Sequence, residues 1–389
     1  MSITDSSNLS PMTEGIVPIG LDERRGRVEK ARALMAESGL DAILVEPGSS
    51  LLYFLGVEWG RSERVTAAVI PAEEDVAYVT PAFEEARLRE GLLIGDDVRV
   101  WEEDEDPFAR VAKILEDRGI RRLGIEGSVR FFVLDGIRRA APNTECVSAD
   151  PVTVPCRAVK SPAEIALMQR AMDITTAAYK ACLPLLEEGV MREEFQTAAA
   201  HAHATLGAKG GITCQFGETT AYPHGGGESK PLREGDVVLM DGGCTAEGYH
   251  SDMSRTIVLG RPTRRQRDIW ELEKAAQAAA FEAAQVGAPC EAVDAAARAV
   301  ITRAGFGPGY KVPGLPHRTG HGIGLDIHEP QSIVKGNRTP LAPGMCFTDE
   351  PMIAIYGEFG VRLEDCVHIT EEGPRFFTQP SPAIDRPFE

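Results

Sequence analysis

The chain has 389 residues, of which 43% are hydrophobic and 26% are charged, a composition typical of a globular protein long enough for two domains. Its formal net charge of −18 argues against a nucleic acid or an anionic membrane as partner. No apolar run is long enough to span a bilayer, and the polar opening does not have the regions of a secretory signal. We therefore expect a cytoplasmic protein. The eight cysteines form no C-x-x-C pair and are interpreted as free buried thiols.

Alternating helix and strand patterns predict an α/β domain over residues 21–156. An arm of residues 1–20, which we expect to be loosely ordered, precedes it. The expected elements are, in order, a helix at 21–39, strands at 41–46, 66–70 and 76–80, helices at 83–90 and 108–118, and a strand at 123–126.

Residues 49–64 of this domain differ from their surroundings, because aromatic and arginine side chains crowd a glycine-containing loop. They are Tyr53, Trp59, Arg61 and Arg64. Two interpretations stay open: a surface loop with an aromatic anchor, or a functional loop. In the second, the loop closes over an active site, its own or that of a dimer partner, and an arginine meets a substrate carboxylate.

A second domain is predicted over residues 160–389, after a boundary near residues 154–164. Ser161 as N-cap, Pro162 as first helical residue and Glu164 as third mark a helix start. The expected order is a helix to about residue 186, a helix at 192–206 and a hairpin, then helices at 264–285 and 290–304 and a second hairpin. The order helix, helix, hairpin therefore occurs twice.

A direct trace of duplication survives in the sequence at a constant offset of 109 residues. The matching residues are Pro231, Leu232, Gly235 and Asp241 in the first copy, and Pro340, Leu341, Gly344 and Glu350 in the second. The sequence thus predicts an internally duplicated α+β domain.

The first hairpin is predicted to pair two acids. Its first strand ends at Asp241, and a turn centred between Ala246 and Glu247 places Asp252 directly opposite. Cβ atoms of such a pair lie about 4.5–5.5 Å apart, and like charges there destabilise the sheet. Two bare carboxylates at this spacing indicate a bound cation.

The second hairpin repeats this arrangement. A turn centred on Gly357 places Glu350 opposite Glu364. One acidic pair can be an accident of a solvated strand, but two such pairs together favour a metal site.

Residues 316–330 supply histidines on a glycine-punctuated segment, P-H-R-T-G-H-G-I-G-L-D-I-H-E-P. They are His317, His321 and His328. Glycine lets the backbone approach a bound group closely, and a neutral imidazole is a good ligand. We expect His321 to join the four carboxylates in a two-metal site. A mostly oxygen ligand set suits manganese, cobalt, iron or zinc.

In this order Asp241, Asp252, His321, Glu350 and Glu364 resemble the metal ligands of the prolidase, aminopeptidase P and methionine aminopeptidase superfamily, metallopeptidase family M24. The resemblance covers residues 160–370 well and the N-terminal part in outline. It implies a pita-bread (creatinase/aminopeptidase-like) catalytic domain, a creatinase/prolidase-type N-terminal domain and a homodimer. Methionine aminopeptidases lack a large N-terminal domain, so the creatinase and prolidase branch is favoured.

The resemblance also implies roles for further residues. His224, on a glycine-rich loop, and His317 would line the substrate pocket, while His328 would hydrogen-bond the substrate and assist proton transfer. Arg362 shares a strand face with Glu364 and would orient that carboxylate or bind substrate. We expect no role for His201, His203, His250 and His368.

The implied reaction is hydrolysis with two divalent metal ions. Manganese is the favoured ion, and cobalt, zinc or iron are the alternatives. Asp252 and Glu364 would bridge the two ions around a water of lowered pKa, with Asp241 on one ion and His321 and Glu350 on the other. Glu350 would also be the general base. The implied substrate is a small Xaa-Pro peptide, whose bond is a tertiary amide without an N–H.

Three activities stay open. The compact length and the arginine-bearing loop favour an Xaa-Pro dipeptidase, which needs a group to capture the free proline carboxylate. An aminopeptidase P, acting on longer peptides, leaves that side open. A creatinase-like C–N hydrolase or a lyase would act on a small non-peptide molecule. Creatinase-like relatives and binding modules of this fold depart from the five ligands that are intact here.

Overall fold

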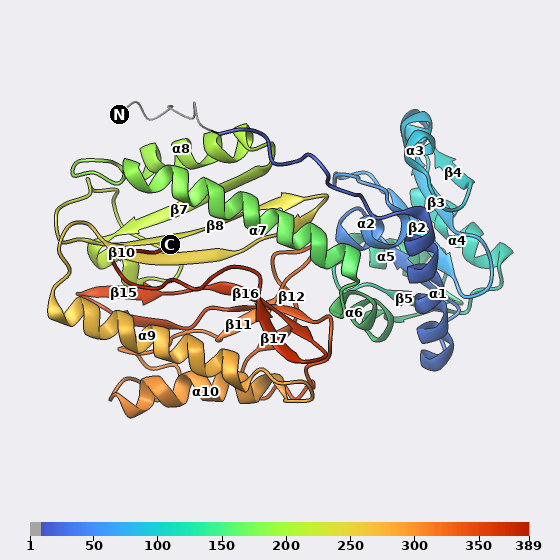
Figure 1. Cartoon of the computed structure of the whole chain (residues 1–389). Helices are drawn as coiled ribbons and strands as arrows, with labels where there is room; N and C mark the ends of the chain where they lie inside the picture. The colour runs from blue at the N-terminus through green and yellow to red at the C-terminus, as the bar shows by residue number, and fades with distance from the viewer. Residues whose placement is uncertain (1–8, 389) are drawn as a thin grey trace. The chain divides into compact units, whose positions relative to one another are not determined.

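The computed structural model describes residues 9–388 and divides into two compact units (Figure 1). The N-terminal unit is Ile19–Arg157, and the C-terminal unit comprises residues 158–388 together with residues 9–18. The change of unit after Arg157 lies inside the predicted boundary segment. Among the described residues, no helix is long and apolar enough to cross a bilayer.

The N-terminal unit is built on a six-stranded sheet in the order β4-β3-β2-β1-β5-β6. Strands β1, β2 and β3 are buried at every residue, as strands covered on both faces are. In chain order the elements are α1 (Leu21–Ser38), β1 (Ala42–Val45), α2 (Ser49–Leu55), β2 (Ala67–Pro71), β3 (Ala77–Pro81), α3 (Glu85–Gly91), β4 (Asp97–Trp101), α4 (Pro107–Asp117), β5 (Arg122–Ile125), α5 (Phe131–Ala140), β6 (Glu145–Ser148) and α6 (Asp150–Ala158).

Each helix and strand predicted for this unit is present, but α2, β4, α5, β6 and α6 were not predicted. Strand β4 is half-buried and carries Asp97 and Arg99, which pair with each other, so its sequence does not read as an apolar run. The prediction of a loop over all of residues 49–64 is wrong at its start. Residues 49–55 form α2, whose apolar side chains are mostly buried and which ends at Gly56 with φ 74°.

The C-terminal unit contains two main sheets, β10-β8-β7 and β12-β11-β13-β16-β17, and a pair of strands β14-β15. In Figure 1, α7 and α8 lie on one side of the strands, and α9 and α10 lie on the other. The elements are α7 (Pro162–Cys182), α8 (Arg192–Thr205), β7 (Lys209–Phe216), β8 (Val237–Ala246), β9 (Tyr249–His250), β10 (Met253–Val258), α9 (Arg264–Ala283), α10 (Cys290–Arg303), β11 (Gly320–Gly322), β12 (Glu329–Ile333), β13 (Cys346–Asp349), β14 (Met352–Ile355), β15 (Phe359–Arg362), β16 (Asp365–Thr370) and β17 (Gly373–Phe376).

Backbone hydrogen bonds confirm the predicted duplication. In the first copy, Gly189 N donates to Leu232 O and Leu232 N donates to Val190 O. In the second copy, Gly287 N donates to Leu341 O and Leu341 N donates to Ala288 O. Helices α7 and α9 each begin with a capping box, as the pattern at Ser161 predicted for α7. The two copies therefore share both their helix starts and their loop connections.

The register predicted for the first hairpin is wrong. Asp241 pairs with Ser254 and not with Asp252, because the turn is centred between Glu247 and Gly248. Both turn residues have positive φ, 48° and 83°, which suits the twist of a two-residue hairpin. Moving the turn centre by one residue shifts the partner by two, so Asp252 keeps the strand face that was expected.

The register predicted for the second hairpin is confirmed. The paired residues of β14 and β15, and those of β13 and β16, are symmetric in sequence about Gly357. The same symmetry places Glu350 opposite Glu364. The pairs on either side are Asp349 with Asp365 and Met352 with Arg362.

The described part of the predicted arm packs against the C-terminal unit. Met12 N donates to Leu206 O over 2.9 Å, and Arg170 Nη1 donates to Met12 O over 3.0 Å. Leu9 and Ile16 pack on the same apolar cluster as Met12. Residues 1–8 of the arm lie outside the described residues.

The matched glycines of the two copies allow a test of the packing at the second hairpin. Gly235 (φ 85°) has open space where a Cβ would be, whereas a Cβ on Gly344 (φ 87°) would lie 2.8 Å from Lys160 O. We expect Gly235→Ala to lower the free energy of unfolding by about 1 kcal/mol, for the left-handed backbone alone. Gly344→Ala should cost about 1–3 kcal/mol more. Urea unfolding measures both, and equal losses would contradict this description of the hairpin.

Candidate metal centre

The five ligands predicted from the sequence line one cavity of about 560 Å³ in the C-terminal unit. Asp241 lies on β8, and Asp252 lies just before β10. His321 is the middle residue of β11. Glu350 lies just after β13, and Glu364 lies just before β16. Both copies of the duplicated domain thus contribute ligands to the cavity.

The ligand atoms are close enough to share cations. His321 Nε2 lies 3.3 Å from Glu350 Oε1 and 3.7 Å from Asp252 Oδ2. Asp252, His321 and Glu364 each offer one ligand atom within 4.8 Å of the other two. Glu364 and His321 are buried, so these groups are held mostly out of water.

Two buried hydroxyl groups, of Ser254 and Thr348, hold the ligands in place. Ser254 Oγ lies 2.6 Å from Glu364 Oε2 and 3.1 Å from Asp241 Oδ1. Thr348 Oγ1 accepts from His321 N over 3.0 Å and donates to Glu350 over 3.2 Å.

The sequence argument missed both hydroxyl residues. Each lies two residues along the chain from a predicted ligand, Ser254 after Asp252 and Thr348 before Glu350. Two-residue periodicity therefore could have indicated that they share the ligands' strand face.

Arg362, predicted to orient Glu364 or to bind substrate, is buried and contacts a different ligand. Its Nη2 donates to Asp241 Oδ2 over 2.7 Å, and its Nε donates to Ser254 Oγ over 2.9 Å. Its Nη1 donates to Pro223 O over 3.1 Å, on the loop that carries His224. Burial opposes its charge, but Asp241 and Glu364 raise the pKa of Arg362 above its usual value.

Burial sets the charge state of the ligands. It raises the pKa of Glu350 to about 7 and raises the pKa of Asp252 and Glu364 well above their usual values, with nearby carboxylates adding to the last two shifts. Burial also lowers the pKa of His321 to about 3, so its imidazole is neutral. His321 Nδ1 lies 3.1 Å from Gly322 O, an acceptor, which leaves the Nε2 lone pair facing the carboxylates.

This donor set fits divalent cations. Crowded carboxylates in a buried site are costly unless positive charge compensates them, and Arg362 is one cation among four acids. Carboxylate oxygens with one imidazole nitrogen are ligands that manganese, cobalt, iron and zinc accept. Asp241, Asp252, His321, Glu350 and Glu364 are therefore the residues that would hold the metal ions.

The predicted accessory histidines differ in their surroundings. His224 and His328 line the same cavity as the ligands, and the His328 ring lies edge-on to His321 with centroids 4.2 Å apart. His317 is enclosed, and burial lowers its pKa to about 4. Its Nδ1 lies 2.7 Å from Arg318 O, and its buried Nε2 has no partner among the described residues.

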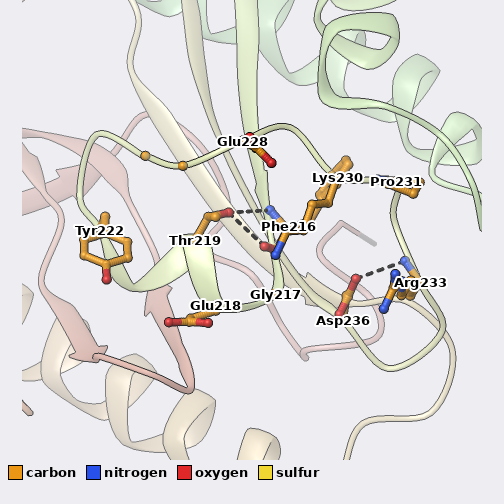
Figure 2. Close-up of a pocket in the computed structure, with 12 residues that line it drawn as sticks. Phe216, Gly217, Glu218, Thr219, Tyr222, Glu228, Lys230, Pro231, Arg233 and Asp236 are labelled. Atoms are coloured by element: carbon orange, nitrogen blue, oxygen red, sulfur yellow. Dashed lines mark hydrogen bonds between the residues drawn. The ribbon is translucent and has the colours of Figure 1, made fainter.

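Neighbours of His224 on its loop line a second cavity, of about 480 Å³, whose lining residues are drawn in Figure 2. Tyr222 and Gly226 line the second cavity, while His224 between them lines the first. Tyr222 stacks on Tyr356 with ring centroids 5.1 Å apart. Together with the bond from Arg362 to Pro223, this stacking ties the His224 loop to the second hairpin.

The residues predicted for the 49–64 loop have partners within the N-terminal unit. The Tyr53 hydroxyl donates to Cys156 O over 2.6 Å, and the Arg87 guanidinium lies 4.3 Å from the Trp59 ring centroid. Arg61 donates to Pro47 O and Ser128 Oγ, and Arg64 forms ion pairs with Glu63 and Glu103. Their part in substrate binding remains a prediction.

Comparison with known proteins identifies the family. Residues 166–371 match the model of metallopeptidase family M24, and residues 27–159 match the creatinase/prolidase N-terminal domain. The chain therefore belongs to metallopeptidase family M24.

Three relatives illustrate the similarity. The chain is 32% identical to an Xaa-Pro dipeptidase of Lactobacillus helveticus, over 90% of this chain and 96% of that protein. Dipeptidase PepE from Mycobacterium ulcerans superposes with a TM-score of 0.87 at 31% identity, covering 96% and 100% of the two chains. A prolidase from Thermococcus sibiricus gives 0.84 at 29% identity, covering 91% and 96%. The predicted fold class, an α/β domain followed by a duplicated pita-bread domain, is confirmed.

The raised pKa of Glu350 predicts how the metal-free protein responds to pH. A carboxyl whose pKa is about 7 when folded and 4.5 when unfolded stabilises the fold below pH 4.5. This contribution is lost as the pH rises through 7, and it amounts to about 3 kcal/mol. Between pH 4.5 and pH 8, chelator-treated protein should therefore lose more unfolding free energy than its Glu350→Gln variant. Denaturant unfolding of both proteins at the two pH values measures the difference, and parallel pH profiles would refute the assignment.

Proposed function

We propose that this protein is a metal-dependent hydrolase that cleaves Xaa-Pro peptide bonds, acting as an Xaa-Pro dipeptidase. It uses two divalent ions, for which manganese is the first choice and cobalt, zinc or iron are the alternatives. The observation that supports this most strongly is the assembly of four carboxylates and one neutral imidazole in one cavity that His224 and His328 also line. Relatives named Xaa-Pro dipeptidase and prolidase, which match this chain over nearly their whole length, support the substrate class.

In this proposal Asp241, Asp252, His321, Glu350 and Glu364 would hold the metal ions, with Asp252 and Glu364 shared between them as the resemblance implies. When bound, the ions supply Lewis-acid polarisation of the scissile carbonyl and lower the pKa of a water molecule. Glu350 is the proposed general base, a role that rests on the resemblance to prolidases; in the metal-free protein, burial raises the pKa of its carboxyl to about 7.

The neighbouring side chains position substrate and ligands. Burial lowers the pKa of His328, so its neutral imidazole can donate one hydrogen bond to the substrate carbonyl as negative charge develops there. Glu350 then passes its proton to the departing proline nitrogen. Ser254, Thr348 and Arg362 contact ligands and keep the carboxylates in one arrangement.

The cavity suits a short peptide with an apolar ring. Its volume of about 560 Å³ is in the usual range for small-molecule sites. Ile212 and Ile327 line it together with the polar residues, and they offer apolar surface to a proline ring, which has no N–H to satisfy.

We further propose a cytoplasmic homodimer. The eight cysteines are all free thiols in the structure, which fits a reducing compartment. The dimer rests on the resemblance to prolidases.

The proposed activity has a direct test. Protein loaded with manganese should hydrolyse Ala-Pro, release proline, and lose this activity when a chelator removes the metal. Ala-Pro-Ala as a parallel substrate separates the dipeptidase from an aminopeptidase. Metal binding with cleavage of neither peptide would contradict the proposed substrate class.

Replacing His328 should damage turnover without removing the metal. We expect His328→Ala to lower kcat by about 100- to 1,000-fold, since it deletes a donor to the developing oxyanion. Metal content by elemental analysis should equal that of the wild type. His201→Ala, at an exposed position of α8, is the control and should leave kcat unchanged. A normal kcat in His328→Ala would remove this residue from the mechanism.

A further inference from the structure

A dipeptidase must recognise the free carboxylate on the C-terminal proline of its substrate. The side chain that binds this carboxylate is the subject of the present inference. The inference rests on the proposed function. Arg362, a candidate from the sequence, already donates to Asp241, Ser254 and Pro223. A guanidinium engaged by three acceptors has little capacity left for a substrate carboxylate.

Arg318 is a cation beside the metal centre that is not engaged in this way. It lies in the segment leading into β11, three residues before His321. Its half-buried side chain donates from Nη1 to Ser332 Oγ over 3.1 Å, and within residues 9–388 it forms no ion pair with an acid. Ser332 lies on β12 next to Ile333, whose partner on β11 is Gly320, the residue before His321, so the contact with Ser332 keeps the Arg318 guanidinium near the metal centre. Its charge also lowers, after burial, the pKa of His328, which lines the cavity.

The other buried or partly buried arginines nearby are paired. Arg255 forms a buried ion pair with Asp365 over 2.7 Å, and Arg298 pairs with Asp294 over 2.9 Å. Arg318 is half-exposed, so water reaches the guanidinium donors that Ser332 does not use until an anion takes the place of that water. Arg318 therefore has the unfilled donor capacity that an anion could use.

The strand beside Arg318 is shaped to hold it there. The pairing of β11 with β12 shifts register between Gly320 and Gly322, which makes a bulge around Gln331. Gln331 has φ 79°, and its buried Oε1 has no partner among the described residues. Such bulges are frequent next to active sites, where they re-aim side chains. The bulge lies directly before Ser332, the residue that holds Arg318.

We propose that Arg318 binds the C-terminal carboxylate of the substrate and thereby makes this metal site a dipeptidase. Its planar guanidinium, held on one side by Ser332, keeps donors for a two-point contact with a carboxylate. An amide or a further residue in place of the carboxylate would remove the charge and one acceptor. Arg318 is thus a residue for substrate specificity, separate from the metal ligands.

The test compares Ala-Pro with Ala-Pro amide in wild-type protein and in Arg318→Met, both loaded with manganese. For Arg318→Met we expect kcat/KM on Ala-Pro to fall on the order of 10- to 100-fold, mainly through KM. The ratio of kcat/KM on Ala-Pro to that on the amide should fall equally. Arg303→Met, which removes an exposed arginine at the end of α10, should keep the wild-type ratio.

Thermal unfolding and metal content verify that the variant is folded and loaded. If Arg318→Met does not fold, Arg318→Gln, which keeps a donor to Ser332, takes its place with the same expected fall in the ratio. If the ratio of kcat/KM on Ala-Pro to that on the amide stays unchanged, whether both activities fall equally or neither falls, the assignment of Arg318 alone is overturned. Failure of the wild type to cleave either substrate would overturn the proposed function and this inference with it.

Discussion

The crowding of four carboxylates in one cavity is the constraint on which the rest of the C-terminal unit depends. Asp241 and Asp252 come from the first hairpin and Glu350 and Glu364 from the second. The two hairpins meet at Ser254 and Glu364, whose backbones exchange hydrogen bonds of 3.3 and 3.1 Å. Like charges at this proximity raise the free energy of the folded state, so the fold is compatible with the site only when cations, or protons, compensate them.

The duplicated architecture explains how such a site is held. Each copy supplies one hairpin. Helices α7 and α9 begin at the N-cap residues Ser161 and Thr263, each with a capping box. Buried hydroxyl groups and Arg362 then satisfy the ligand oxygens that face the protein. The opposite side of the ligands remains open to the cavity with His224 and His328. The scaffold therefore fixes the charge-bearing groups on rigid strands and leaves the substrate side to loops.

Much of this arrangement could be predicted from the sequence, because it depends on local patterns. The start of α7, the register of the second hairpin and the duplication follow from capping residues, a turn glycine and a repeated spacing. The first hairpin was misplaced because Glu247 adopts a positive φ, which its side chain does not indicate. Periodicity could have placed Ser254 and Thr348 on the strand face of the ligands, but the contacts that they and Arg318 make are visible only in the tertiary structure.

The most direct test of the metal centre is the number of divalent ions that the protein binds. Titration calorimetry of metal-free protein with manganese, checked by elemental analysis after gel filtration, gives this number per chain. The proposed function predicts two ions for the wild type and a loss of tight binding in Asp252→Asn, because this variant removes one of the proposed ligand carboxylates. A wild-type protein that binds no divalent ion, or an Asp252→Asn variant that binds two as tightly, would contradict the account.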